Sequence, residues 1–123
     1  MTALGFDIAA ARFGDDHSPF LSARSVAEQL GVTLAELAKL IGVARNTLVA
    51  PSSARKVDGA LSPVVRILAM ASEMAGDESR AAIWFKHQPI PGWAGKTAYD
   101  LVGEGKADKV LAYLEAVRSG VYA

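Results

Sequence analysis

The chain has 123 residues, of which 51% are apolar, and a formal net charge of zero at pH 7. This length suits one compact unit, or at most two very small ones that share a core. The zero net charge argues against non-specific coating of nucleic acid, and the absence of cysteine excludes disulfides and cysteine-based zinc sites and suits a reducing cytoplasm.

Metal and membrane sites are not expected. His17 and His87 stand alone, without a second ligand at metal-binding spacing, so we expect neither a metal nor a cofactor. The N-terminus lacks a basic region followed by an apolar run, and no stretch of about 18 apolar residues could span a bilayer. These features predict a cytoplasmic protein without a membrane partner.

The first helix is predicted to begin near residue 22. Residues 1–21 mix glycine, aspartate and proline with one short apolar piece, which predicts a flexible or loosely packed N-terminal arm. After it, Ser22 or Ser25 can cap a helix that ends at Gly31, a residue suited to the left-handed conformation that follows many helices.

Two further short helices are predicted next. Thr33, followed three residues later by Glu36, forms a capping box that opens a helix ending at Gly42. A third helix should run over about residues 44–49 and end before Pro51, because proline cannot donate the backbone hydrogen bond. The side chains of this second helix that we expect to be buried are Leu34, Leu37, Ala38 and Ile41.

Ser62 followed by Pro63 predicts the start of the next helix, with a hydroxyl cap and proline at the first helical position. Gly76 should end it, and Asp77 should cap the helix after that. The apolar side chains that recur at helical spacing in these two segments are Val64, Ile67, Leu68, Ala71, Met74, Ala81, Ala82, Trp84 and Phe85.

Residues 88–96 hold two prolines and two glycines and are predicted to form a loop. Thr97 and Asp100 cap a short helix, and the last helix should cover about residues 106–118. Its apolar stripe consists of Val110, Leu111, Leu114 and Val117. Since no segment alternates with a period of two, the predicted fold class is all-α.

Residues 34–48 have the pattern of a helix-turn-helix. Ala38 is small enough for two helices to cross, and Gly42 lies four residues later, where the turn can require a positive φ. The first positions of the second helix then face the major groove, where arginine can pair with guanine and asparagine with adenine. The predicted DNA-binding residues are Arg45, Asn46, Thr47, Arg55 and Lys56, the last two at phosphates.

Two observations weaken the DNA-binding hypothesis. Pro51 shortens the second helix, and the chain is neutral, so a homodimer that reads two half-sites would be needed. A purely structural helical pair with a solvated polar face remains the alternative.

The C-terminal third, residues 83–123, has two features that core packing does not demand. Trp84, Phe85 and Trp93 surround the loop, and the last residues combine an arginine, a tyrosine and a free carboxylate. The tryptophans can simply close a small core, and the tail can be a frayed terminus. Alternatively, such a tail is suited to enter a cleft on another protein.

Three pieces of sequence carry a family resemblance. They are the tryptophan-bearing helix, the turn Gly95-Lys-Thr-Ala-Tyr-Asp-Leu and the closing Gly120-Val-Tyr, in this order and spacing. Together they resemble the Xre/MbcA/ParS family of antitoxins, with an Xre-like helix-turn-helix region over residues 22–60 and a toxin-binding domain over 61–123. Ala98 stands where the family usually has proline.

The resemblance implies a partner and an inhibitory mode. The partner is a RES-domain toxin, of a family that depletes NAD, and the C-terminal end of the antitoxin occludes its active site. It also implies a homodimer that binds operator DNA and represses its own operon. The residues implied to bind toxin are Lys109, Tyr113, Arg118, Gly120, Val121, Tyr122 and Ala123.

Two other classes of function are alternatives to an antitoxin. The carboxylates Asp100, Glu104, Asp108 and Glu115 fall on polar helix faces without a nearby histidine or metal motif, so we expect no enzyme. A stand-alone DNA-binding regulator without a toxin would share the helix-turn-helix and use the C-terminal third only for dimerisation.

Overall fold

The computed structural model describes residues 21–120, which form seven α-helices and no strand, so the all-α prediction is confirmed. The predicted arm lies outside the described residues, apart from Leu21. The helices are α2 (Ala23–Leu30), α3 (Leu34–Ile41), α4 (Arg45–Val49), α5 (Ala54–Ala75), α6 (Glu78–His87), α7 (Ala98–Gly103) and α8 (Ala107–Arg118), and a 3₁₀ turn, η1 (Pro51–Ser53), precedes α5.

The helix boundaries follow from local chemistry, as predicted. The Ser22 hydroxyl accepts a hydrogen bond from the Ser25 N–H, and Thr33 and Glu36 satisfy each other's backbone N–H groups in a capping box. Gly42 ends α3 with a φ of 77°, a conformation in which a side chain would be strained. Free backbone donors and acceptors at these helix ends are thereby satisfied without tertiary contacts.

One predicted boundary is wrong. Helix α5 does not start at Ser62–Pro63 but runs unbroken over Ala54–Ala75 with Pro63 inside it. The turns before the proline already bury Val57 and Leu61. Proline inside a helix costs about 3 kcal/mol, whereas burying each such apolar side chain contributes about 1.5–3 kcal/mol, so the continuous helix wins.

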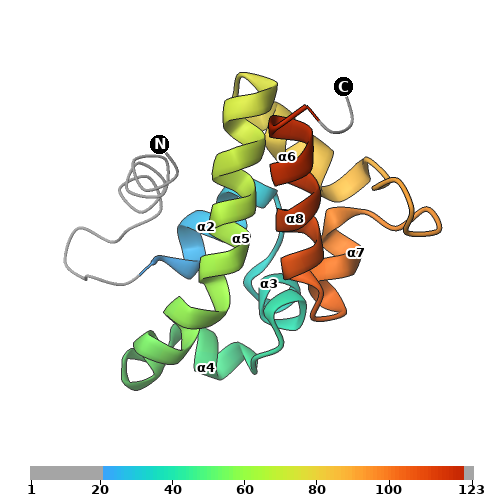
Figure 1. Ribbon diagram of the computed structural model, residues 1–123. Helices are drawn as coiled ribbons and strands as arrows, with labels where there is room; N and C mark the ends of the chain where they lie inside the picture. The colour runs from blue at the N-terminus through green and yellow to red at the C-terminus, as the bar shows by residue number, and fades with distance from the viewer. Residues whose placement is uncertain (1–20, 121–123) are drawn as a thin grey trace.

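Helix α5 is the central element of the core. It packs against α2, α4, α6 and α8 (Figure 1). The largest fully buried side chains come from six helices and the loop before α7: Leu30, Leu37, Leu61, Ile67, Leu68, Phe85, Ile90, Leu101 and Val110. Since α5 crosses residue 60, both halves of the chain share one hydrophobic core.

Several core predictions need correction. In α3, Leu40 is buried, whereas Leu34 and Ile41 are only partly buried. Met74, in the last turn of α5, is 40% exposed, so the apolar stripe of that helix continues beyond the neighbours that cover it. Trp84 is partly buried and packs against the core rather than lying within it.

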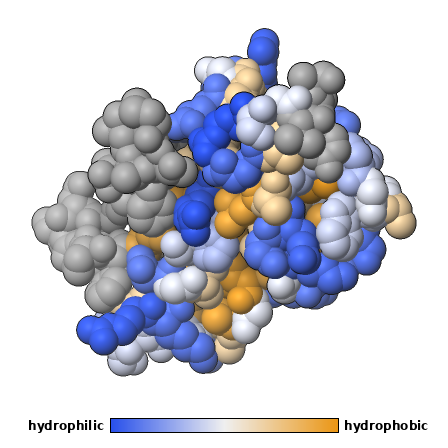
Figure 2. Space-filling view, in the orientation of Figure 1, coloured by the Kyte–Doolittle hydropathy of each residue, from blue (hydrophilic) through white to orange (hydrophobic). Residues whose placement is uncertain are grey.

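The two ends of the molecule are formed by different helices. Helix α4 and the start of α5 lie at one end, and the C-terminal ends of α5 and α8 lie at the other (Figure 1). The end where α5 begins is mainly hydrophilic in the face shown by Figure 2. In residues 21–120, no helix is both long and apolar enough to cross a lipid bilayer.

Candidate functional site

The first candidate surface is the helix pair α3–α4. Ala38 is buried where α3 meets the turn, and its carbonyl accepts a hydrogen bond of 3.0 Å from the Val43 N–H. Leu48 is also buried, which fixes α4 against the rest of the core. Ala38 of α3 and Leu48 of α4 therefore both belong to the hydrophobic core.

This arrangement leaves the polar side of α4 open. Arg45 and Asn46 are exposed, Thr47 is half-buried, and Arg55 and Lys56 are exposed on the first turn of α5. Helix α4 has five residues and ends at Val49 because Pro51 follows. All five predicted DNA-binding residues therefore lie at the end of the molecule where α5 begins, although on two successive helices.

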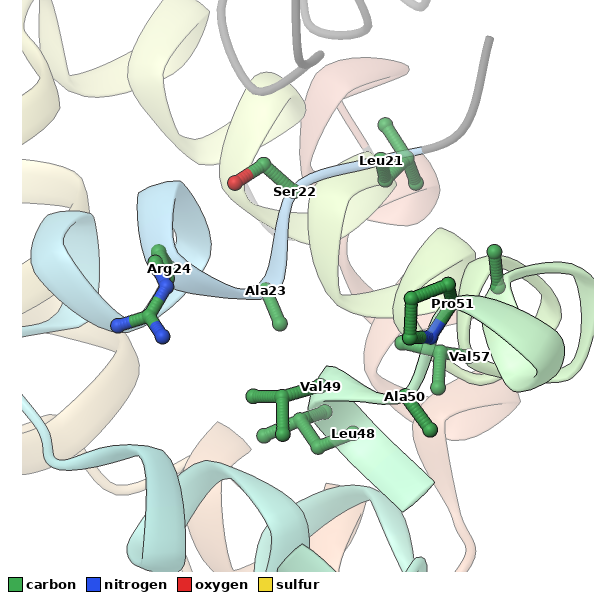
Figure 3. Close-up of a pocket in the computed structure, with 10 residues that line it drawn as sticks. Leu21, Ser22, Ala23, Arg24, Leu48, Val49, Ala50, Pro51 and Val57 are labelled. Atoms are coloured by element: carbon green, nitrogen blue, oxygen red, sulfur yellow. The ribbon is translucent and has the colours of Figure 1, made fainter. Parts of the chain in front are cut away.

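A pocket of about 220 Å³ lies beside α4, between the start of α2 and the start of α5 (Figure 3). Most of its lining residues have apolar side chains, among them Ala23, Val49, Pro51 and Val57, and Arg24 is the one charged lining residue, but the surface that faces the pocket is more polar than apolar. Val49 is 45% exposed there. No pattern in the sequence predicts this pocket, because its walls come from segments that only the fold brings together.

The second candidate surface is formed by α6, α7, α8 and the loop between α6 and α7. Phe85 is fully buried and meets Tyr99 edge-on, with ring centroids 6.1 Å apart. Burial also raises the pKa of the Tyr99 hydroxyl above its ordinary value. Trp84 and Trp93 are both partly buried and pack against the outside of the core.

The loop is tied to the α7–α8 turn by charge. The Lys96 ammonium lies 2.8 Å and the Lys106 ammonium 3.3 Å from the Glu104 carboxylate, and these hydrogen bonds hold the pKa of Glu104 below its usual range. Lys106 also lies 5.5 Å from the centre of the Trp93 ring, within cation–π range. The loop is therefore attached to the α7–α8 turn at two points, through Lys96 and through Trp93.

Thr97 and Asp100 form a second capping box at the start of α7. Ala98, which stands where the resembling family usually has proline, is fully buried. Because the Thr97 hydroxyl accepts from the Asp100 N–H at 3.1 Å, this helix begins at the expected residue without the proline.

Helix α8 carries the first of the residues that the resemblance implied for toxin binding. Lys109 is exposed, with its ammonium 3.9 Å from the Asp108 carboxylate, and Tyr113 packs partly buried one turn later. Arg118 follows Tyr113 by five residues, which is about 140° around a helix of 3.6 residues per turn. Lys109 and Tyr113 therefore lie on one face of α8, and Arg118 lies on a different face.

The end of the described chain is held by local contacts. Arg118 pairs with the Glu115 carboxylate, and Gly120 turns the chain with a φ of 88°. Val121, Tyr122 and Ala123, the remaining residues implied to bind toxin, lie outside the described residues. Sequence reasoning missed Ile83, which is 59% exposed on α6 and is the most exposed large apolar side chain in residues 21–120.

The carboxylates of the enzyme alternative all have structural partners. Asp100 caps α7, Glu104 pairs with two lysines, Asp108 lies near Lys109, and Glu115 pairs with Arg118. Within residues 21–120, no group of three histidine, aspartate or glutamate side chains could hold a metal ion.

Comparison with known proteins bears on this second surface. Residues 70–120 match the family model of the antitoxin Xre/MbcA/ParS C-terminal toxin-binding domain. The match begins in the second half of α5 and covers α6, α7 and α8. No curated protein and no solved structure matches the chain. The C-terminal part of the chain is thus similar to a domain of antitoxins that binds toxins.

Proposed function

We propose that this chain is the antitoxin of a toxin–antitoxin pair and that it acts by binding rather than by catalysis. The observation that carries this proposal is the match of residues 70–120 to a toxin-binding domain. The structural roles of the four carboxylates on α7 and α8 add support, because each is engaged in a cap or an ion pair. Co-purification with the product of a neighbouring gene tests it, and failure of any such product to bind would contradict it.

We further propose a RES-domain toxin as the partner and the C-terminal end as the inhibitory element. The contacts would come from the exposed side of α8 and from the residues after it. The candidate residues are Lys109, Tyr113, Arg118, Gly120, Val121, Tyr122 and Ala123. In this mode the tail occludes the active-site entrance of the toxin and prevents NAD depletion.

Deletion of residues 119–123 tests the tail. Helix α8 ends at Arg118, so the deletion removes no helix and the fold should persist, whereas rescue of toxin-expressing cells should be lost. Arg118→Ala should weaken rescue, and Arg66→Ala, an exposed arginine on α5, serves as the matched control. Full rescue by the shortened chain would refute the tail-insertion mode and leave toxin binding by another surface.

A second proposed function is operator binding by a homodimer. It is favoured by the exposure of Arg45 and Asn46 at the start of α4, directly after the turn at Gly42. Each side chain can read a base edge in the major groove. Two chains would place two short helices in successive half-sites and so compensate for the length of α4.

Changing Arg45 and Asn46 to alanine tests this readout. Operator affinity should fall while toxin binding is unchanged, because these residues lie at the opposite end of the molecule from the C-terminal end of α8 (Figure 1). Arg66→Ala again controls for the loss of one positive charge. Unchanged mobility shifts would remove Arg45 and Asn46 from the readout. A chain that binds its operator but has no toxin partner would instead fit the stand-alone regulator.

A further inference from the structure

We propose that the pocket beside α4 receives a backbone phosphate of duplex DNA and that Arg24 is the side chain that binds it. The inference rests on the proposed operator binding and deepens it, because it adds a phosphate contact from α2, outside the helix pair α3–α4. It depends on the polar surface of the pocket, on the charge of the segments around it and on its place beside α4.

The surface of the pocket suits an anion better than an apolar group. Ser22 and Arg24 are the only polar side chains among the described lining residues, and yet the surface that faces the pocket is more polar than apolar. Backbone groups must therefore supply part of that polar surface. A cavity needs about 10–15 Å³ to hold one water molecule, so a pocket of about 220 Å³ has room for a phosphate group with some of its water.

Arg24 is the one charged residue that lines the pocket, and its side chain is exposed. It comes from the start of α2, across the pocket from Val49 and Pro51 (Figure 3). The Arg24 side chain makes neither a hydrogen bond nor an ion pair with another residue of 21–120, so none of these residues competes for its guanidinium. A guanidinium can donate two parallel N–H groups to the oxygens of one phosphate.

The segments around the pocket carry positive charge that the neutral total of the chain conceals. Residues 37–57, which run from α3 to the first turn of α5, contain no acidic residue. Arg55 and Lys56 directly follow Ala54, which lines the pocket, so positive charge borders the pocket on its α5 side as well. Asp58, the first acidic residue after them, accepts a hydrogen bond from a backbone N–H. A polyanion such as DNA is therefore attracted to this end of the molecule.

The place of the pocket relative to α4 fits the path of the DNA backbone. Leu48 and Val49 of the last turn of α4 line the pocket. Arg45 and Asn46, the proposed base-reading residues, begin the same helix. Its five residues span about 7.5 Å, less than the major-groove width of about 12 Å. When the start of α4 lies in the groove, its end therefore stays close to the phosphates that border the groove.

Binding of duplex DNA at several salt concentrations tests the role of Arg24. The two probes are the duplex upstream of the gene and a duplex of scrambled sequence. A phosphate contact releases counterions, so Arg24→Ala should lower the affinity for both probes by the same factor, about five- to tenfold at about 0.1 M salt. The slope of log affinity against log salt concentration should fall in magnitude by about 1. Asn46→Ala should instead weaken binding to the operator and leave the scrambled duplex unaffected.

Matched variants separate a local contact from a general effect of charge. Arg24→Lys keeps the positive charge and should retain the salt slope, as should Arg66→Ala, which removes an exposed charge from the middle of α5. Ser22→Asp preserves the helix cap but places negative charge in the pocket, so it should weaken binding to both probes. Ser79→Asp adds the same charge to the first turn of α6 and should have no effect. Circular dichroism checks that each variant folds.

Neutral methylphosphonates, placed one at a time in the operator strands, identify the contacted phosphate. At the contacted position the neutral group should weaken binding by the natural chain and have no effect on Arg24→Ala. Inorganic phosphate should displace the DNA no better than chloride at equal ionic strength. Stronger displacement by phosphate would show a site for free anions and overturn the assignment to DNA.

Failure of this inference is distinguishable from failure of operator binding. If Arg45→Ala with Asn46→Ala weakens operator binding while Arg24→Ala keeps the affinity and salt slope of the natural chain, the phosphate contact is refuted and operator binding stands. If the chain binds neither duplex, both proposals fail. An effect of Arg24→Ala on toxin binding alone would place a protein at this pocket and likewise refute the phosphate contact.

Discussion

Two apolar residues near the middle of α6 lie in opposite environments. Ile83 is 59% exposed, and Phe85, two residues later, is fully buried against the edge of Tyr99. Two residues correspond to about 200° of helix rotation, so neighbouring positions of this kind face opposite sides. The pair offers a direct comparison between a side chain that holds the core and one that does not.

Phe85→Ala should lower the free energy of unfolding by about 3–5 kcal/mol, because it removes a buried ring and leaves a cavity. Ile83→Ala should change it by no more than about 0.5 kcal/mol, as expected of an exposed side chain. Urea denaturation of both variants measures the difference. A Phe85→Ala loss as small as that of Ile83→Ala would contradict the packing described for α6.

Glu104 provides a test at low pH. Its pKa in the folded chain is lowered from 4.5 by the hydrogen bonds to Lys96 and Lys106. A carboxyl group with a lowered folded pKa contributes stability above its unfolded pKa and loses that contribution as the pH falls through the folded value. Glu104→Gln should therefore be less stable than the natural chain at pH 7.

The stability difference between Glu104→Gln and the natural chain should shrink as the pH is lowered below 4.5. High salt should shrink it too, because the group is exposed and its ion pairs are screened. Thermal denaturation over a pH series measures this. A difference that is independent of both pH and salt would exclude the ion pairs as its cause.

At the level of helices, the sequence predicted the helix ends that local hydrogen bonds determine, but not the one that tertiary packing determines. The capping boxes at Thr33 and Thr97 and the stop at Gly42 were predicted from sequence because their hydrogen bonds form between residues close in the chain. The start of α5 was not, because the burial of Val57 and Leu61 overrides the local proline signal. That burial depends on other helices, which no local pattern reveals.

Helix α5 gives a prediction about its own interior. Pro63→Ala should raise the free energy of unfolding by about 1–3 kcal/mol, because it restores a backbone donor in the middle of the helix. Gly59→Ala should raise it by about 0.5–1 kcal/mol, since nothing lies within 4 Å of the added methyl group. Chemical denaturation measures both, and a loss of stability in Pro63→Ala would show that the ring makes packing contacts of its own.

Over the whole molecule, the two proposed surfaces are far apart. Helix α4 and the start of α5 lie at one end, and the C-terminal end of α8 lies at the other (Figure 1). The exposure of Arg45 and Asn46 could be predicted because spacing on a short helix is a local property. The pocket beside α4 could not, because its walls come from three separate helices and η1.

This separation predicts that the chain binds toxin and operator at the same time. A complex with the toxin should still shift operator DNA in a gel, with a mobility lower than that of the chain alone. Arg45→Ala with Asn46→Ala should abolish the shift of this complex without dissociating it. Release of DNA on addition of toxin would instead indicate that the two surfaces overlap or exclude one another.

Helix α5 also determines how the protein can be divided experimentally. A cut near residue 60 leaves Val57 on one fragment and Leu61 on the other, although both contribute to one core. Each fragment would expose apolar surface that the intact chain buries, and even complete domains of about 60 residues are only marginally stable. Expressed separately, the halves should aggregate, so the proposed operator-binding and toxin-binding functions are best separated by point substitutions in the intact chain.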